Sequence, residues 1–126
     1  MTPSERHREG VFARWGSECY ARAHGDCSGR VQAAHWISKQ GLRIKQSQIR
    51  LAIRGLQINR DVAIKESHRL MADMPLDGLV ADPRNGVPLC SHHHDSFDRR
   101  NGQALDLKPP EEVREFAAEY GLEDWI

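Results

Sequence analysis

A thiol, three imidazoles and two carboxylates lie between Cys90 and Asp98. Residues three or four apart are neighbours on a helix, so Cys90 and His93 would share one face. The same rule places His94 beside Asp98. A Cys–His pair suits zinc, whereas a His–Asp pair offers nitrogen and oxygen to a harder, catalytic cation. The spacing therefore predicts two metal sites on one helix, and the alternative is a solvated helix end whose histidines bind nothing.

A short strand ahead of this segment carries a further imidazole. Residues 31–37 fit an extended conformation in which alternate side chains share a face, with His35 on one face and Ala34 on the other. A histidine on a strand is normally half-buried and satisfied by local hydrogen bonds. Here a cysteine-bearing loop precedes it and a second Cys/His segment follows, and this context favours a functional role for His35.

Turn signals indicate how the chain reaches the helix. Asn85-Gly86 is a turn dipeptide, and Pro88 suits the first turn of a helix, where its missing N–H costs nothing. Residues 78–81 are apolar enough to form a strand that returns before this turn. We therefore expect strands over residues 31–37 and 78–81, and a helix that starts at Pro88.

The three cysteines point to metal rather than to disulfides. An odd number argues against a closed disulfide framework and for a reduced compartment. Cys19 and Cys27 are separated by seven residues, a looser spacing than that of a Cys-x2-Cys knuckle, so two half-buried thiols are the alternative. His24, inside this spacer, is either a substitute ligand or a plain loop residue. The N-terminus lacks a signal peptide and no apolar run is of membrane-spanning length, which predicts a cytoplasmic protein.

The chain has the length of one domain, 126 residues, and its formal net charge is zero. Residues 28–60 nevertheless contain no acidic side chain, whereas the segment from Glu111 onward is strongly acidic. The basic stretch predicts either a face that follows a nucleic-acid backbone or an ordinary solvated helix surface. The candidate nucleic-acid contacts are Lys39, Arg43, Lys45, Arg50, Arg54, Arg99 and Arg100.

Helices complete the expected architecture. The first spans residues 4–14 and is capped by Ser4. Two more are expected over residues 44–54, ended by Gly55, and 61–74, ended by Pro75. A short strand over residues 104–107 then precedes a C-terminal helix over about 110–120, whose packing stripe is Val113, Phe116, Ala117 and Tyr120.

Two separate parts of the chain resemble one family. Ala34-His35-Trp36-Ile37 and residues 85–98 together look like the HNH endonucleases, the ββα-metal or His-Me finger group, and in particular like small members encoded by phages and prophages. The resemblance covers residues 19–38 and 79–100, about a third of the chain. Its motifs occur in the expected order, and their chemistry agrees with that read from the spacing above.

The resemblance implies a role for each motif residue. In that family the first histidine is the general base, an asparagine before the helix keeps it oriented, and the second histidine holds the divalent metal. These roles fall on His35, Asn85 and His94, with Asp98 as a further metal ligand. An ion held by so few protein groups suits Mg2+ or Mn2+, which keep waters and bind through phosphate. An imidazole with its unperturbed pKa of about 6.5 suits the base.

Many family members also hold a structural zinc between an N-terminal Cys pair and a Cys-x2-Cys. The resemblance implies a zinc site of this kind in which a histidine replaces the fourth cysteine, formed by Cys19, Cys27, Cys90 and His93.

The sequence departs from the family pattern in two places. Ala34 stands where the family often has Asp, Glu or His as a further metal ligand. A long basic helical insert over about 42–75 separates the two halves of the finger.

These inferences predict an α+β fold with a small ββα-metal finger core, a structural zinc site, a helical insert and flanking N- and C-terminal helices. Residues 1–126 would form a single HNH nuclease domain. The expected function is a metal-dependent DNA endonuclease. One alternative is a catalytically silent, zinc-stabilised nucleic-acid-binding module of a phage packaging or recombination system, which Ala34 favours. Another is a protein-interaction domain of such a system, which the acidic C-terminal helix favours.

Overall fold

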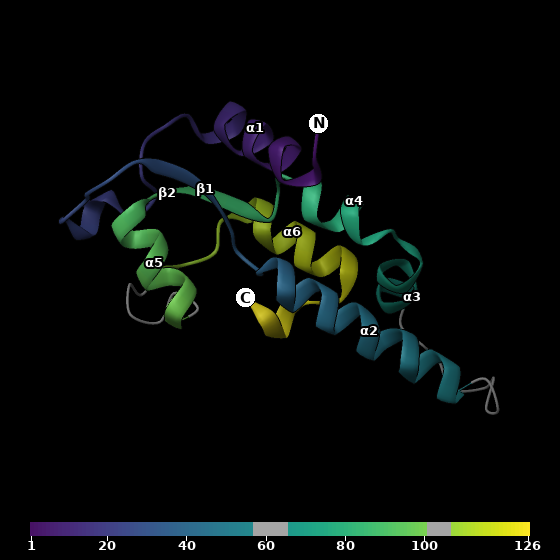
Figure 1. The fold of residues 1–126 in the computed structure, drawn as a ribbon. Coiled ribbons are helices and arrows are strands. Elements are labelled where there is room, and N and C mark those ends of the chain that lie inside the picture. Colours follow the sequence, from purple (N-terminus) through teal and green to yellow (C-terminus); the bar gives the residue numbers. More distant parts are fainter. Residues whose placement is uncertain (57–65, 101–106) are drawn as a thin grey trace.

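The computed structural model describes residues 1–56, 66–100 and 107–126, and only the backbone of residues 56, 66–68 and 98–100. Its helices and two strands form an α+β fold, as predicted (Figure 1). The elements are α1 (Pro3–Trp15), β1 (Val31–His35), α2 (Lys39–Leu56), α3 (Glu66–Asp73), α4 (Leu76–Ala81), β2 (Gly86–Cys90), α5 (Ser91–Arg100) and α6 (Glu111–Tyr120), with short 3-10 turns at Arg22–His24 and Glu123–Trp125. None of the described helices is long and apolar enough to span a membrane.

The two strands form an antiparallel pair in which Val31 lies opposite Cys90 and His35 lies opposite Gly86. The prediction of the first strand is confirmed. The predicted return strand over residues 78–81 is wrong, because these residues belong to α4 and the chain turns before it enters β2. All five residues of β2 are buried, which fits a short, continuous apolar run.

Pro88 lies in the middle of β2, so the prediction that it starts a helix is wrong. Its carbonyl accepts a hydrogen bond from the amide of Tyr20, 2.7 Å away, rather than from β1. The N–H and C=O of a strand residue point to the same side, so the missing N–H of Pro88 removes no bond to β1. The helix starts instead at Ser91, directly after the strand.

α1 and α5 lie on opposite sides of the two-stranded sheet (Figure 1). On the α1 side, the ring of His7 stacks on the ring of His35. On the α5 side, Ala34 packs in one apolar cluster with Phe97. The alternation predicted for the first strand is therefore confirmed, and each helix contacts its own set of strand side chains.

A second apolar cluster joins α2, α3, α4 and α6 around Leu42, Met71 and Leu79. It supports α4 and the turn that leads from α4 into β2. The packing stripe predicted for the C-terminal helix is confirmed, because each of its side chains is buried: Val113, Phe116, Ala117 and Tyr120.

The first helix is capped by Thr2 rather than by Ser4, since Thr2 Oγ1 accepts a hydrogen bond from the Glu5 amide at 3.1 Å. α2 begins earlier than predicted, because Ser38 Oγ accepts from the Gly41 amide at 3.0 Å and caps a helix that starts at residue 39.

α2 also continues beyond residue 54, so Gly55 does not end it. α3 ends at Asp73, before Pro75, as predicted. Residues 61–65 of the expected second insert helix and residues 104–106 of the expected short strand lie outside the described part of the chain.

Candidate functional site

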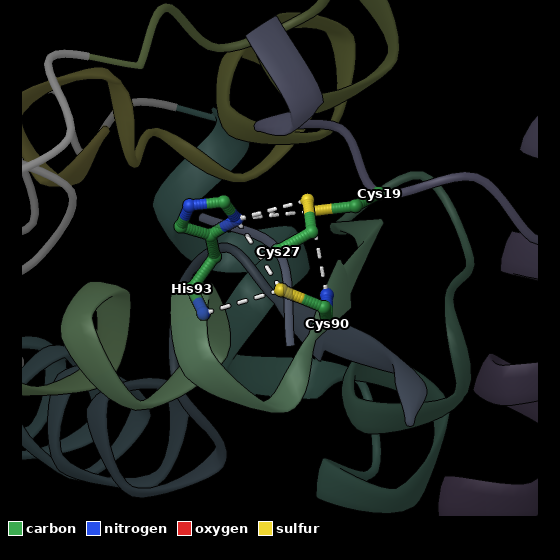
Figure 2. A group of neighbouring side chains, drawn as sticks. All are labelled: Cys19, Cys27, Cys90 and His93. Atoms are coloured by element: carbon green, nitrogen blue, oxygen red, sulfur yellow. Dashed lines mark hydrogen bonds between the residues drawn. The ribbon is translucent and has the colours of Figure 1, made fainter. Parts of the chain in front are cut away.

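Four potential metal ligands from three parts of the chain meet beside the sheet (Figure 2). Cys19 follows α1, Cys27 lies in the loop before β1, Cys90 ends β2, and His93 lies in the first turn of α5. Their ligand atoms all lie within 4.8 Å of one another, and all but Cys27 are buried. His24 is exposed in a 3-10 turn and is not part of this cluster. The four residues that the family resemblance groups together are thus neighbours in the fold.

The geometry of this cluster fits a tetrahedral metal centre. The Nδ1 atom of His93 lies 3.3 Å from Cys19 Sγ, 3.6 Å from Cys27 Sγ and 3.3 Å from Cys90 Sγ. One ring nitrogen has a single proton or a single lone pair, so it cannot make three ordinary hydrogen bonds at once. Tetrahedral zinc with its usual Zn–S and Zn–N bonds separates sulfur from nitrogen by about 3.5 Å. The donor set and its spacing therefore fit zinc.

The thiols differ in how readily they ionise. Desolvation acts to raise the pKa of the Cys90 thiol, but hydrogen bonds, first those from the backbone of His93 and Ser28, outweigh it, so this pKa is lowered. The pKa of the Cys27 thiol is raised to about 11, by desolvation first and then by hydrogen bonding and repulsion from Cys19 and Cys90. Metal binding requires thiolates, and the positive charge of the metal offsets their repulsion. Two backbone amides add support, because the amide of Cys90 donates to Cys19 Sγ at 3.4 Å and that of His93 donates to Cys90 Sγ at 3.5 Å.

The loop that carries Cys27 fits closely against the start of α5. A Cβ atom at Gly29 would lie 2.7 Å from Cβ of Ser91, and Gly29 has a φ of +83°, so the position requires glycine on both counts. The Ser91 hydroxyl donates to the Arg30 carbonyl at 3.0 Å. The loop and the helix are therefore fixed to one another beside the cluster.

His35 ends β1 and is partly buried. Its Nε2 lies 2.9 Å from the carbonyl oxygen of Val80, which can only accept, so Nε2 carries the proton and Nδ1 carries the lone pair. Burial lowers the pKa of His35 to about 4, and repulsion from His7 adds to the shift, against the opposing effect of the Val80 hydrogen bond. The expectation of an unperturbed imidazole is wrong for this environment.

Asn85 is fully buried in the turn before β2. Its Oδ1 accepts from the Ile37 amide at 2.8 Å and its Nδ2 donates to the Ile37 carbonyl at 2.9 Å. Its backbone carbonyl accepts from the Trp36 amide at 3.2 Å and from His7 Nε2 at 3.0 Å. The asparagine thus binds the chain directly after His35.

His94 projects from the first turn of α5 toward the other face of β1. Its Nδ1 lies 2.7 Å from Oε1 of Gln32. When Nδ1 donates to this oxygen, Nε2 carries the lone pair that a metal needs. Asp98 lies four residues further along the same helix, and its side chain lies outside the described part of the structure.

His35 and His94 line one cavity of about 510 Å3, although they come from opposite sides of β1. Three cationic side chains, those of Arg8, Arg30 and Lys39, line the same cavity. Ala34 does not line it, and its side chain is 1% exposed in the apolar cluster below. Two imidazoles and three cationic side chains, together with the carboxylate of Glu5, therefore line one space large enough for a phosphate group.

The expected nucleic-acid contacts divide into groups. Lys39 lines the cavity, and Lys39 and Arg43 line a neighbouring hollow. Arg50 donates to the Ala72 carbonyl at 3.0 Å, and Lys45 lies 5.7 Å from the centre of the Trp125 ring, so both also make contacts within the protein. Arg54 lies in the last turn of α2, and the side chains of Arg99 and Arg100 lie outside the described part.

Sequence reasoning missed two residues that contact the candidate site. Gln32 shares the face of Ala34, opposite His35, but nothing in its spacing indicated a bond to His94, which lies 62 residues further along the chain. His7 is 1% exposed and stacks on His35. A signal for His7 existed, since it precedes the buried Val11 by one helical turn and must share its face.

An antiparallel pair of strands followed by a helix, with one histidine on the first strand and another on the helix, is consistent with the ββα core of the HNH endonucleases. A sequence model of the HNH endonuclease family matches residues 17–101, which is most of the chain, and the protein therefore belongs to the HNH endonuclease family. No curated protein and no solved structure matches the chain. The family match does not bear on a phage source or on packaging partners, which stay predictions.

Proposed function

We propose that this protein is a divalent-metal-dependent DNA endonuclease that hydrolyses phosphodiester bonds. The observation that carries the proposal is the shared cavity of His35 and His94, with cationic side chains around it. Membership of the HNH family supports a nuclease and DNA as its substrate. The products would carry 5′-phosphate and 3′-hydroxyl ends.

In this proposal His35 is the general base. Because Nε2–H donates a hydrogen bond to the Val80 carbonyl, the lone pair lies on Nδ1. This lone pair would take a proton from a water molecule beside the scissile phosphate. A base with a pKa of about 4 is weak at neutral pH. The negative charge of a bound phosphate raises the pKa of a nearby imidazole, and would thus strengthen the base when DNA is present. Asn85 keeps the end of the strand in place through Ile37.

His94 and Asp98 would hold the catalytic ion, with Gln32 fixing the His94 ring. A bound Mg2+ or Mn2+ would supply positive charge to a non-bridging oxygen and to the leaving 3′-oxygen. Ala34 cannot contribute, because its methyl group has no donor atom, and it is buried in the apolar cluster. Two protein ligands suit an ion that keeps most of its waters.

We further propose that the Cys3His cluster binds structural Zn2+. All four coordination positions would be filled by protein, as in structural rather than catalytic zinc sites. The zinc would join the loop before β1, the end of β2 and the first turn of α5. It would thereby fix the helix that carries His94 relative to the strand that carries His35.

DNA would contact the cationic rim of the cavity and continue along the first turns of α2. The rim consists of Arg8, Arg30 and Lys39, and Arg43 lies in the adjoining hollow. Because phosphate contacts release counterions, binding should weaken steeply as salt is raised. The wider set proposed to contact DNA is Lys39, Arg43, Lys45, Arg50, Arg54, Arg99 and Arg100.

Cleavage of supercoiled plasmid tests the proposal. Wild-type protein, His35→Ala and the loop control His24→Ala would be compared with Mg2+, Mn2+, Zn2+ or EDTA. Metal-dependent nicking by wild type and by the His24 variant, lost in His35→Ala, is the expected result. Folded, zinc-loaded protein that cleaves with none of these metals would overturn it. A salt-dependent gel shift without cleavage would then support the silent binding module.

A further inference from the structure

His7 contacts the candidate site from α1, outside the residues that match the family. Its ring lies 3.6 Å from that of His35, centre to centre, with an angle of 11° between the ring planes. The side chain is 1% exposed, so water does not compete for this surface. The stack restricts rotation of the His35 ring about its Cβ–Cγ bond.

The surrounding chain is shaped to accept the His7 ring. A Cβ atom at Gly86 would lie 2.5 Å from His7 Nε2 and 2.8 Å from the Ala34 carbonyl oxygen, so any side chain there would displace the ring. One turn further along α1, a Cβ atom at Gly10 would lie 2.4 Å from Cβ of Pro83. Two glycines therefore let the helix and its histidine approach the sheet closely.

His7 also forms a hydrogen bond with Asn85, the buried residue in the turn before β2. Its Nε2 lies 3.0 Å from the backbone carbonyl of Asn85, which can only accept, so His7 donates this bond. The same carbonyl accepts from the Trp36 amide. The His35 ring is thus held at its edge by Val80 and on its face by His7, whose own ring is tied to Asn85.

We propose that His7 is a positioning residue, which holds the imidazole of His35 in the orientation needed to take a proton from water. This inference rests on the proposed role of His35 as the base. A general base must stay within hydrogen-bond reach of its proton, and a misplacement of about 1 Å can cost about 100-fold in rate. The alternative is that His7 only fills space in the core, and this alternative predicts a loss of stability without a specific loss of kcat.

Three substitutions separate the stack from the hydrogen bond. His7→Phe keeps a flat ring and loses the donor, while the Asn85 carbonyl keeps its bond from Trp36. His7→Gln keeps an N–H donor and loses the ring, and His7→Ala loses both. Val11→Ala is the matched control, because Val11 is fully buried one turn along the same helix and makes no ring contact with His35.

Multiple-turnover cleavage with saturating Mn2+ gives kcat and KM for each variant below its melting temperature. We expect His7→Phe to retain kcat within about threefold, and His7→Gln and His7→Ala to lose about tenfold or more with KM nearly unchanged. Val11→Ala should lower the melting temperature and leave kcat unchanged. Equal kcat in wild type, His7→Gln and His7→Ala would overturn the positioning role, as would a loss in Val11→Ala as large as theirs.

A second measurement does not depend on cleavage. Imidazole 1H–15N spectra at fixed neutral pH report the tautomer of His35, which should be the Nε2–H form in wild type and in His7→Phe. In His7→Gln we expect a mixture of both tautomers, because the released ring can turn away from Val80. An unchanged spectrum in His7→Gln would contradict the inference. Failure of the proposed function looks different, since wild type would then cleave nothing while the spectra still test the position of the ring.

Discussion

The side chain of Gln32 joins the first strand to the helix that follows the second, because its Oε1 lies 2.7 Å from Nδ1 of His94. Gln32 and His94 are 62 residues apart in the chain, yet when Nδ1 donates this bond the lone pair of the His94 ring lies on Nε2. His35 leaves the opposite face of the same strand. β1 therefore orients both imidazoles, one directly and one through an amide.

The first prediction concerns this amide. Gln32→Leu keeps the size of the side chain and removes the acceptor, so His94 loses its preferred tautomer. We expect the Mg2+ or Mn2+ concentration for half-maximal cleavage to rise about 10-fold or more, as is usual when a partner of a metal-binding histidine is removed. Metal titrations of plasmid nicking would measure this. Gln48→Leu, an exposed change on α2, is the control, and an identical titration curve for Gln32→Leu would show that His94 does not depend on the bond.

The second prediction concerns the Cys3His cluster. Purified protein should contain about one zinc per chain, and a strong chelator should remove it together with the fold, because ligand and folding equilibria are coupled. Circular dichroism recorded alongside a zinc-sensitive dye would follow both changes. Cys27→Ala should lose zinc although Cys27 is the exposed ligand, whereas His24→Ala should retain it. A protein that keeps its structure after complete zinc removal would exclude a structural site.

The family resemblance grouped the four residues of the Cys3His cluster, whereas the local pattern put Cys90 on a helix that in fact begins only at Ser91. Cys90 and His93 are three residues apart, so their proximity follows from any turn-like path, and the alternation around His35 requires only a strand. Pro88 was misread because its most common local use is at a helix start. The Tyr20 amide, which comes from a distant loop, gives it a place in β2 that no local rule contains.

The parts of the site that sequence could not predict are long-range contacts. The stack of His7 on His35 and the bond from Gln32 to His94 depend on how two helices pack on one strand. The pKa of His35 depends on burial, which spacing alone does not determine. Ala34 gives a converse case, since its departure from the family pattern was visible in the sequence but its buried position was not.

The third prediction concerns the turn before β2. Arg84 makes a two-pronged ion pair with Asp82, at 2.7 Å for the closest pair of atoms, and a second ion pair with Glu119 on α6. Asp82 also accepts from the Arg84 amide at 2.9 Å and its side chain is 17% exposed, against 44% for Glu119. Asp82→Ala should therefore cost about 1–2 kcal/mol of unfolding free energy, and Glu119→Ala less than about 0.5 kcal/mol. Urea denaturation would measure both, and equal losses would contradict this ranking.

The last prediction uses the pH dependence of stability. An unfolded histidine has a pKa of about 6.5, whereas folding lowers the pKa of His35 to about 4 by burial. Between these values the unfolded state binds a proton that the folded state excludes, so the free energy of unfolding falls as pH is lowered from 6.5 toward 4. His7 acts in the same direction, because burial also lowers its pKa.

Replacing His35 with Gln removes one of these titrations. Wild type should therefore lose stability more steeply than His35→Gln over this window, by at most about 1.4 kcal/mol per pH unit, and the two should run parallel above pH 7. Zinc loss at low pH affects both proteins, so the difference between them isolates His35. Urea denaturation at several pH values gives this difference. If the difference in unfolding free energy between wild type and His35→Gln stayed constant from pH 7 to pH 4, folding would not lower the pKa of His35, which would contradict the prediction.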